Sequence, residues 1–541
     1  MTERFSRIGM PLLVALGLAW VHANASPWGE PWKNNDETRH VMTGVFFRDA
    51  LCDWRESTVD PRGYATRYYA QYPALGVLVW PPFFYAVEGV AMAAFGTDYG
   101  VARAVLLAFD LLAAFYFVRL SQRLVGPVTA SLALALVGLS SQVFDLSRYV
   151  LLELPCLALV LGSIDHFERC LGEYRRRDAL AACLLAALAA LTRFDAIVLL
   201  PYFAARLVTT RQYRLLLKPG VLVGVAGALV LTGPYYLLTY REYGTGLSAA
   251  ATTGSDAAAA KFVSLGNFAE YPSFMLDQVG WCVLFWACVG AVVGGRTRHP
   301  AFAVAVTLTL STYVTFAPMA ECVDRHTIYW VPALALFAAV GLTEFARRAG
   351  RRLGFCAVLL SVGGTGFQST WHPGWFVRGY EEAAIYVVEH RETDRPVLME
   401  GVLNGGFIYQ VRRHDASRSL RVVRGDKLFY AVLSDPANGY REFARTDAEL
   451  LAKLHEADPE FVVVEFPQLF ELNTPVGPRL RDLLRGDPER FQLERRIVFE
   501  TNHDSFLYHG LEVYRKRDRN PAPPPAGAIP VLGLGREVGG R

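Results

Sequence analysis

Acidic side chains stand at the ends of apolar segments in the first third of the chain. The stretch NNDETRH at 34–40 holds Asp36 and Glu37 directly after the first apolar run. A second stretch, SSQVFDLSRYVLLELPCLAL at 140–159, places Arg148 and Glu153 at the start of another apolar run. Charged groups near a membrane are costly and normally mark a water-filled cavity. The pattern predicts a polar site at the membrane edge, while each acid taken singly is also consistent with a solvated loop end.

Basic side chains occur in comparable positions further along the chain. The link ALTRFDAIVLLP carries Arg193 beside Asp195, and ECVDRHTIYWVPAL carries Arg325 and His326. Guanidinium groups match phosphate oxygens bidentately, so an arginine at such a position is suited to an anionic ligand. Two simpler interpretations stay open, namely a local ion pair at Arg193 and interfacial anchoring of the second stretch by its Tyr and Trp residues.

Carboxylates facing cations suit the transfer of a group from a phosphate-linked donor. A carboxylate acts as general base on an acceptor hydroxyl, and the cations stabilise the departing phosphate. If the donor is carried by a lipid, the site has to lie at the edge of the bilayer. The candidate catalytic residues are Asp36, Glu37 and Glu153, and the candidate phosphate-binding residues are Arg148, Arg193, Arg325 and His326.

Composition separates the chain into a membrane part and a polar part. Of 541 residues, 52% are hydrophobic and only 19% are charged, although the last third is visibly polar. A formal net charge of +3 is too small to suggest nucleic-acid binding. The eight cysteines show no CxxC or Cys/His spacing, so neither a disulfide framework nor a structural zinc site is expected.

The apolar runs predict an α-helical polytopic membrane protein. The run at 74–95 follows Pro73 and contains Pro81, Pro82 and Glu88, so it is expected to be broken or to lie on the membrane surface. About eleven transmembrane helices remain, with juxtamembrane helices on the outer face. The other runs lie at 8–24, 101–118, 127–146, 150–167, 178–192, 194–209, 216–238, 274–295, 301–319, 328–346 and 353–370.

Basic clusters between the runs set the expected orientation. Placing these clusters in the cytoplasm puts the N-terminus there too, and the first run is expected to be an uncleaved signal anchor. The first loop, 25–73, the loop 239–273 and everything after about 371 then fall on the outer face. All long polar segments are thus on one side of the membrane.

The polar part is expected to form a small extracytoplasmic α/β domain. Helical spacing in GYEEAAIYVVEHR and TDAELLAKLHEA alternates with buried-strand patterns in PVLMEG and EFVVVEF. The expected divisions are a transmembrane domain at 1–370, a soluble domain at 371–516 and a disordered Pro/Gly-rich tail at 517–541. GVLNGGFIYQ lacks GxGxxG, so nucleotide binding is weakly supported.

Several motifs in this order resemble one known family. NNDETRH, YYAQYPALGVLVWPPFFY, SRYVLLELP, LTRFDAIVLLP and DRHTIYWVPALALFAAVGL together resemble the polytopic C-type glycosyltransferases. The branch with protein O-mannosyltransferases and the lipid A aminoarabinose transferase is the most similar, over roughly residues 8–370. The resemblance implies a sugar donor on a polyprenyl phosphate and a first-loop aspartate as base, which is Asp36 here. It also aligns Glu153, Arg193 and Arg325 with an acidic and two basic positions of the family.

The sequence departs from the family pattern in two places. The usual HPPL reads WPPF, so Trp80 replaces a histidine whose role is then in doubt. The first loop lacks DxD, so no cofactor or metal is expected, although a divalent metal stays possible. Tyr69, Tyr72 and Trp80, which lie in the stretch after the first-loop acids, are the expected lining of the acceptor cavity.

The leading hypothesis is a membrane glycosyltransferase that moves a sugar from a polyprenyl-phosphate-linked donor. Its acceptor would be a lipid, glycan or protein on the outer face of the plasma membrane, which in bacteria is the inner membrane. A lipid or polyol transporter or flippase is the alternative, since intramembrane charges and prolines suit it equally. A membrane scaffold with a partner-binding C-terminal domain is a third possibility. The absence of a convincing internal repeat argues against a transporter.

Overall fold

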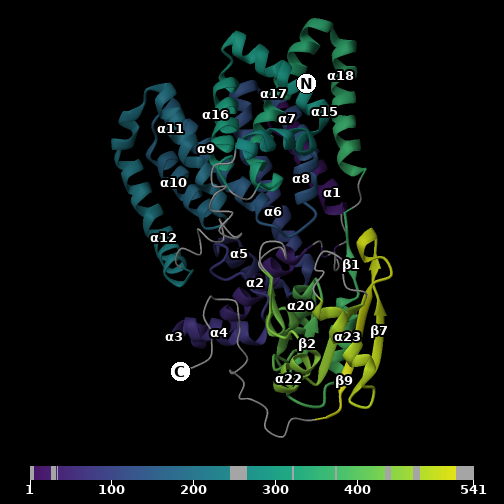
Figure 1. Cartoon of the computed structure of the whole chain (residues 1–541). Helices are drawn as coiled ribbons and strands as arrows, with labels where there is room; N and C mark the ends of the chain where they lie inside the picture. Colours follow the sequence, from purple (N-terminus) through teal and green to yellow (C-terminus); the bar gives the residue numbers. More distant parts are fainter. Residues whose placement is uncertain are drawn as a thin grey trace.

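The computed structural model describes most of the chain in full atomic detail. It covers residues 5–25, 28, 32, 34–243, 265–319, 322–371, 374–432, 440–466 and 475–518. Lys33, most of the predicted loop at 239–273 and nearly all of the predicted tail at 517–541 lie outside these residues. A helical bundle forms the upper part in Figure 1, and a sheet with its own helices forms the lower part.

Six of the described helical segments are long and apolar enough to cross a membrane by length and composition, at 5–24, 99–125, 219–241, 268–297, 324–349 and 351–370. Shorter apolar helices cover 83–95, 127–138 and 300–316. The prediction of a polytopic helical protein is confirmed, and the count of eleven spans stays a prediction. The bundle consists of η1 (Phe5–Gly9), α1 (Met10–Asn24), α6 (Tyr99–Val125), α7 (Pro127–Gly138), α8 (Ser141–Leu146), α9 (Glu153–Gly172), α10 (Arg176–Ala190), η2 (Phe194–Val198), α11 (Leu199–Thr210), η3 (Tyr213–Leu217), α12 (Pro219–Tyr243), α15 (Leu265–Thr297), α16 (Pro300–Phe316), η4 (Asp324–Trp330), α17 (Val331–Ala349) and α18 (Arg351–Thr370).

The apolar run at 74–95 is interrupted, as its prolines predict. Residues 74–82 form turns and an isolated bridge, and only α5 (Phe83–Phe95) is helical. Leu78 sits in the left-handed region at φ 66°, which an ordinary helix excludes. The break brings the chain before α5 back against α2, because the backbone N–H of Gly76 donates to the hydroxyl of Thr43 at 2.9 Å.

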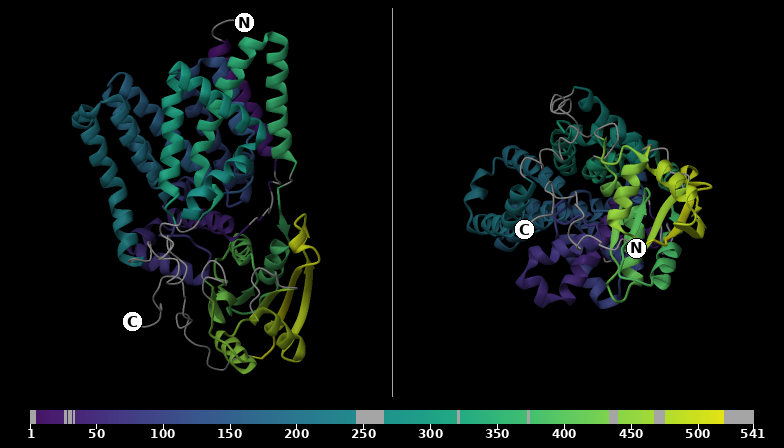
Figure 2. Two further views of the ribbon diagram at one scale, coloured as in Figure 1. Left: turned by 45° about the horizontal axis from the view of Figure 1, so that its top comes forward. Right: turned by 60° about the horizontal axis from the view of Figure 1, so that its bottom comes forward.

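The first polar loop folds into a layer of helices between the bundle and the sheet. It contains α2 (Asn35–Cys52), α3 (Trp54–Val59) and α4 (Pro61–Gln71). Both views in Figure 2 show these purple helices beside the lower ends of the bundle helices. α2 packs along α5, and no segment of α2 is among the described candidate spans. The acidic pair therefore lies on a helix outside the spanning segments.

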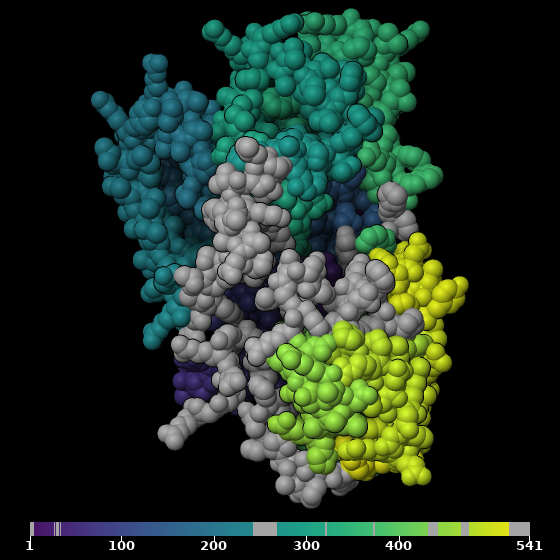
Figure 3. Space-filling model, in the orientation of Figure 1, coloured from purple at the N-terminus to yellow at the C-terminus, as the bar shows by residue number. Residues whose placement is uncertain are grey.

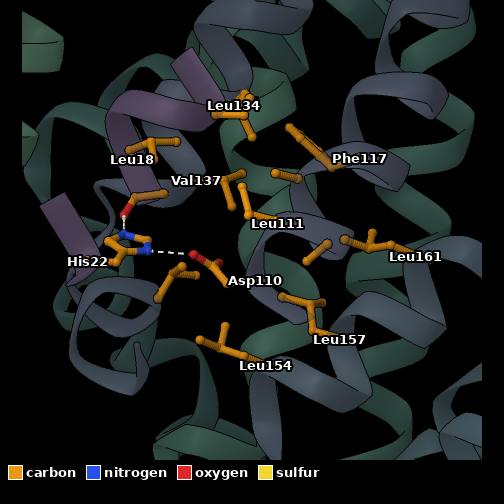
Figure 4. Close-up of a pocket in the computed structure, with 15 residues that line it drawn as sticks. Leu18, His22, Asp110, Leu111, Phe117, Leu134, Val137, Leu154, Leu157 and Leu161 are labelled. Carbon is orange, nitrogen blue, oxygen red and sulfur yellow. Dashed lines mark hydrogen bonds and ion pairs between the residues drawn. The ribbon is translucent and has the colours of Figure 1, made fainter. Parts of the chain in front are cut away.

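α1 is joined to the bundle by a buried histidine. His22 Nδ1 lies 2.7 Å from Asp110 Oδ2 on α6, and Nε2 lies 2.8 Å from the carbonyl oxygen of Gly138 on α7 (Figure 4). Leucine, valine and phenylalanine side chains surround this contact and leave only a cavity of about 30 Å³. The polar contact is therefore an anchor between three helices rather than a site with room for a ligand.

The lower part contains a five-stranded mixed sheet in the order β3-β2-β6-β9-β7. β2 (Val397–Glu400) pairs in parallel with β3 (Val422–Arg424) and β6 (Phe461–Phe466). β9 (Gly510–Lys516) runs antiparallel between β6 and β7 (Phe491–Val498). Every residue of β2 and β6 is buried, including Glu400 and Glu465, which explains why the other residues of both strands are apolar. Two small antiparallel pairs join β1 (Val377–Arg378) to β8 (Glu500–Thr501) and β4 (Tyr430–Val432) to β5 (Tyr440–Glu442).

Helices and strands in this part occur where the sequence predicts them. The two predicted strands are β2 and β6, and the two predicted helices are α19 (Tyr380–His390) and α22 (Asp447–Ala457). α22 begins with a capping box, in which Thr446 and Glu449 satisfy each other's backbone N–H groups. The remaining helices are α20 (Asn404–His414), α21 (Gly425–Leu428), α23 (Val476–Gly486) and the short η7 (Asp504–Phe506).

Ion pairs attach the sheet part to the first-loop helices. Arg412 on α20 donates to both carboxylate oxygens of Asp49 on α2, at 2.7 and 2.6 Å, and both side chains are buried. Arg418 likewise contacts Asp53 at 2.6 Å, and Arg424 donates to the carbonyl oxygen of Pro73 at 2.8 Å. Figure 3 shows the green and yellow block of the C-terminal part against the rest of the molecule. The contacts place the sheet directly below the helix that carries Asp36.

Candidate active site

The amino end of α2 positions the first-loop aspartate. Asn34 is the N-cap residue, and its side-chain oxygen accepts the backbone N–H of Glu37 at 3.1 Å. Asp36 therefore lies in the first helical turn, where a carboxylate is stabilised by the helix dipole. Its side chain is 26% exposed, so it is the accessible member of the acidic pair.

Asp36 is joined to Glu153 through one arginine. Arg325 Nη2 lies 3.1 Å from Asp36 Oδ2, and Arg325 Nε lies 3.6 Å from Glu153 Oε1. The two carboxylates come from α2 and from the start of α9, and the guanidinium comes from η4. The fold thus brings together three segments that are more than a hundred residues apart in the chain. The sequence suggested a shared site but could not show this contact.

A second arginine extends the same network. Arg193 Nη1 donates to Glu153 Oε1 at 2.8 Å, while Nε and Nη2 both donate to Asp195 Oδ2 at 2.8 and 2.6 Å. The local pair between Arg193 and Asp195, one of the two interpretations left open by the sequence, is present. This pair does not exclude the binding of an anionic ligand by Arg193, because Arg193 is shared with Glu153 and also lines the cavity.

The network borders a cavity of about 770 Å³. Six charged or ionisable residues contribute to its lining, namely Asp36, His40, Arg193, Asp195, Arg325 and His326. The rest is apolar and is lined by Leu78, Val79, Trp80, Ala186, Ala190, Phe194, Ala196, Ile197, Leu199, Leu200, Phe203, Tyr236 and Met319. Such a volume accommodates a small polar group together with part of a hydrocarbon chain.

The apolar part of the lining, called the apolar arm below, includes side chains that are exposed at the surface of the bundle. Val79, Ile197 and Leu200 line the cavity and are also 41%, 50% and 65% exposed. Their exposure lies on a part of the molecule whose neighbouring helices are α10, α11 and α12, and α12 includes a candidate span.

Electrostatics keep Asp36 ionised. Burial raises the pKa of its carboxyl, but the neighbouring cations, Arg325 first among them, more than offset this and hold the pKa below its usual value. A carboxylate with a lowered pKa is in its basic form throughout the physiological pH range. It can accept a proton as soon as Arg325 turns to another anion.

Glu37 occupies a different environment from its neighbour. Its carboxylate is fully buried, accepts the backbone N–H of Val150 at 3.1 Å and accepts a hydrogen bond from the hydroxyl of Tyr99. Adjacent residues on a helix point about 100° apart, so only one of the pair can face the cavity. Glu37 fastens α2 to the segment before α9, and the structure does not place it with Asp36.

Four other predicted site residues do not line the cavity. Glu153, predicted to be catalytic, contacts Arg193 and Arg325 from behind the lining, and the other three are Arg148, Tyr69 and Tyr72. Arg148 stacks on the ring of Phe144 at 4.3 Å and donates to the carbonyl oxygen of Ser369 at 3.3 Å. Tyr72 is buried and receives a hydrogen bond from Gln71 at 3.2 Å, and Tyr69 lies in the same helical layer. Arg148 was expected beside the phosphate because it precedes Glu153, but the turn at 147–152 points it toward α18.

Trp80 and His326 do line the cavity, as expected. The ring of His326 stacks on Phe316 with centroids 5.7 Å apart. His40 was not among the candidate site residues nominated from the sequence, whereas the structure places it in the lining of the cavity. Its spacing of four residues from Asp36, one helical turn, was the available signal.

The described residues hold no group of three or more His, Cys, Asp or Glu side chains arranged to bind a metal ion. The carboxylates of the site instead contact arginines.

Removing the N-cap tests how α2 positions Asp36. Asn34→Ala is expected to destabilise the protein by about 1 kcal/mol and to lower transfer activity, because the first turn carrying Asp36 loses its cap. Thermal unfolding and a transfer assay measure the two effects. Asn34→Ser, which retains a capping oxygen, is the matched control, and equal activity of the two variants would contradict this role.

Comparison of sequences relates the middle of the chain to one family. Residues 80–237 match the model of the dolichyl-phosphate-mannose-protein mannosyltransferases. This segment contains Trp80, Glu153, Arg193 and much of the apolar arm. No curated protein matches the chain in sequence.

Comparison of structures extends the similarity to nearly the whole chain. ArnT from Cupriavidus metallidurans matches in its apo state with a TM-score of 0.62 and 14% identity, over 95% of this chain and 98% of ArnT. ArnT bound to undecaprenyl phosphate matches with a TM-score of 0.63 and 14% identity, over 94% and 98%. The oligosaccharyltransferase AglB from Archaeoglobus fulgidus, in complex with an inhibitory peptide and a dolichol-phosphate, matches with a TM-score of 0.51 and 11% identity, over 93% and 75%.

These findings confirm the resemblance inferred from the sequence motifs. The helices long enough to span a membrane, the family model and the fold agree with one another. The chain is thus a multi-pass membrane protein with the fold of ArnT, and its segment 80–237 matches the dolichyl-phosphate-mannose-protein mannosyltransferase family.

Proposed function

We propose that this protein transfers a sugar from a polyprenyl-phosphate-linked donor to a hydroxyl group of a lipid, glycan or protein acceptor. One observation carries the proposal: Asp36, Arg193 and Arg325 line a cavity whose remaining lining is mostly apolar and includes the exposed side chains of Ile197 and Leu200. A lipid-linked sugar phosphate also combines a charged head with a hydrocarbon tail.

Asp36 is the base of the proposed reaction. It takes the proton of the acceptor hydroxyl as the acceptor oxygen forms a bond to the anomeric carbon of the sugar. The bond between that carbon and the phosphate oxygen breaks, and its electron pair leaves with the polyprenyl phosphate. Arg325 and Arg193 stabilise the negative charge that develops on the departing phosphate.

Arg325 couples donor binding to the base. In the present structure it contacts Asp36 at 3.1 Å, so a donor phosphate competes with Asp36 for the same guanidinium. Once the phosphate takes that guanidinium, the carboxylate of Asp36 is released toward the acceptor. Glu153 holds Arg193 and Arg325 together and positions them rather than contacting the substrate.

The lipids named in the matching structures support this donor. One ArnT structure holds undecaprenyl phosphate, and the AglB structure holds a dolichol-phosphate. We assign the apolar arm of the cavity between α10, α11 and α12 to the polyprenyl chain. The comparisons favour this over the transporter hypothesis, since ArnT and AglB match over more than nine tenths of this chain.

The proposed orientation follows from the donor and from the basic clusters. We place the N-terminus in the cytoplasm and the sheet part outside the plasma membrane, with about eleven spans between them. The first-loop helices, the cavity mouth and the sheet then share the outer face. In this arrangement the sheet part, attached through Arg412 and Asp49, lies next to the acceptor.

Filling the apolar arm tests the assignment of the lipid chain. Ala186 faces the cavity from α10, and Ala186→Trp is expected to raise the KM for a long polyprenyl donor by about 10-fold, because the indole fills space the chain needs. A donor with a chain of two or three isoprene units is expected to be less affected. Leu184→Trp on the exposed side of the same helix is the control.

The function as a whole is tested by transfer in membranes supplied with labelled polyprenyl-phosphate sugars. Sugar donors and acceptor fractions are varied until a product is found, and a labelled covalent product is the expected result. Movement of labelled lipid across proteoliposomes without any covalent product would contradict the proposal and support a transporter.

A further inference from the structure

His40 stands one helical turn after Asp36 and faces the same cavity. The side chain is only 2% exposed, yet it lines the 770 Å³ cavity. Because Asp36 and His40 are separated by four residues in α2, their side chains lie on one face of that helix. Any hydroxyl that approaches Asp36 is therefore also close to the imidazole.

A buried tyrosine fixes which nitrogen of His40 carries the proton. His40 Nδ1 lies 2.6 Å from the hydroxyl of Tyr85, and both side chains are buried. Within the described residues, the Tyr85 hydroxyl has no other hydrogen-bond partner. A buried hydroxyl that fails to donate loses free energy, so Tyr85 donates to Nδ1. Nε2 then carries the hydrogen.

Aromatic rings hold the imidazole in place. Tyr85 stacks on His40 with centroids 5.7 Å apart, and Trp80 packs edge-on with centroids 4.9 Å apart. Nδ1 is occupied by Tyr85, so Nε2 is the nitrogen available to a molecule in the cavity. Trp80 occupies the position at which the C-type glycosyltransferases, which the motifs resemble, have a histidine. In this protein the imidazole of His40 lies beside that position.

His40 is a neutral hydrogen-bond donor. Burial lowers the pKa of its imidazole to about 4, with Arg193 and Arg325 acting in the same direction against the carboxylates of Asp36 and Glu153. A neutral ring forms no ion pair with Asp36 or with a phosphate. Its Nε2–H suits an uncharged oxygen, such as that of a hydroxyl.

We propose that His40 binds the acceptor, with Nε2–H donating a hydrogen bond to the oxygen of the acceptor hydroxyl while Asp36 accepts its proton. This inference rests on the proposed function, since it assigns a further substrate-binding residue to the same reaction. His40 orients a lone pair of the nucleophile toward the anomeric carbon, and Tyr85 is a positioning residue that acts through His40.

Two substitutions at position 40 test the hydrogen bond. His40→Leu is expected to lower kcat/KM for the acceptor by about 10-fold, which is the effect of losing one neutral hydrogen bond. His40→Gln, whose amide nitrogen can take the place of Nε2, is expected to stay within about threefold of wild type. Binding of undecaprenyl phosphate alone, measured by direct titration, is expected to be the same in all three proteins.

Tyr85→Phe provides a test that keeps His40. Without the phenol both neutral tautomers become accessible, so the same parameter, kcat/KM for the acceptor, is expected to fall by about threefold. If the His40→Leu protein folds poorly, the His40→Gln and Tyr85→Phe variants still test the role of His40 in acceptor binding. Any wild-type-like value for His40→Leu, a His40→Gln enzyme as impaired as His40→Leu, or weakened undecaprenyl phosphate binding would overturn the role.

Failure of this inference and failure of the proposed function give different results. If the wild-type protein transfers no sugar from any polyprenyl-phosphate donor, the proposed function is wrong and the role of His40 as acceptor ligand falls with it. If the wild type transfers sugar and His40→Leu does so at the same rate, only the inference about His40 is wrong.

Discussion

Asp36→Asn is expected to reduce sugar transfer by about 10²- to 10⁴-fold, the usual contribution of a general base. The amide has the same shape as the carboxylate and can still accept a hydrogen bond from Arg325, so folding is expected to be preserved. What is lost is the capacity to take the proton of the acceptor hydroxyl. Initial rates at saturating donor and acceptor, with thermal unfolding as the measure of folding, separate the two effects.

The pH dependence of the wild type provides a second measure of Asp36. Burial raises its pKa, but Arg325 and the other neighbouring cations lower it further than burial raises it. The base is active when deprotonated, so kcat/KM, which reports the free enzyme, is expected to be insensitive to this group at neutral pH and to fall only as the pH drops through the lowered pKa. Asp36→Asn should lack that acid limb in its residual activity.

A matched control for Asp36 lies on the neighbouring helix α3. Glu56 is exposed and pairs with Arg67 at 2.7 Å, away from the cavity. Glu56→Gln therefore removes a first-loop carboxylate without touching the site, and full activity is expected. Wild-type rates in Asp36→Asn would remove the base from the proposed mechanism, and a loss of activity in Glu56→Gln would show that the whole loop is sensitive to charge.

Arg193→Ala is expected to have the largest effect on stability. The guanidinium is the shared partner of Glu153 and Asp195, and its side chain is 9% exposed. Its removal leaves two carboxylates close together with one counter-ion fewer, and breaking a buried pair in this way costs roughly 3–5 kcal/mol. A strong decrease in the melting temperature and the loss of donor binding are expected together.

Two further variants separate the charge of the site from the packing around it. Arg206→Ala removes an arginine that pairs with Glu168 at 2.6 Å, about 22 Å along α9 from Glu153. It is expected to lower the melting temperature while leaving the activity of the folded protein unchanged. Glu153→Gln combined with Arg193→Ala removes one unpaired carboxylate and should recover part of the stability, but not donor binding. Recovery of donor binding would exclude Arg193 as a phosphate ligand.

Several of the residues that meet at the candidate site could be nominated from the sequence, whereas their chemical roles stay predictions. The positions of Asp36, Glu153, Arg193 and Arg325 at the ends of apolar runs were sufficient to nominate them, because a charge at the membrane edge needs a partner or a cavity. Several helices and strands of the sheet part could also be predicted from the sequence. β2 and β6 are buried on both faces. The capping box of α22 consists of four consecutive residues, Thr446 to Glu449.

Other assignments could not be made without the tertiary structure. Sequence proximity suggested Glu37 as a substitute for Asp36 and Arg148 as a phosphate ligand, yet one faces Tyr99 and the other Ser369. The direction of a side chain depends on the rotation of its helix and on the turn before it. His40 was underestimated for the same reason, since only the contact with Tyr85 defines its tautomer.

The sequence by itself thus determined the class of protein, the apolar segments, the polar side chains at their ends and the order of motifs that resembles C-type glycosyltransferases. These properties are local, because they depend on the hydrophobicity and spacing of neighbouring residues. Only the tertiary structure decided that α2, α10, η2, α11, α12 and η4 meet at one largely apolar cavity. That meeting depends on packing between segments far apart in the chain, and the spacing of residues within each segment carries no information about it.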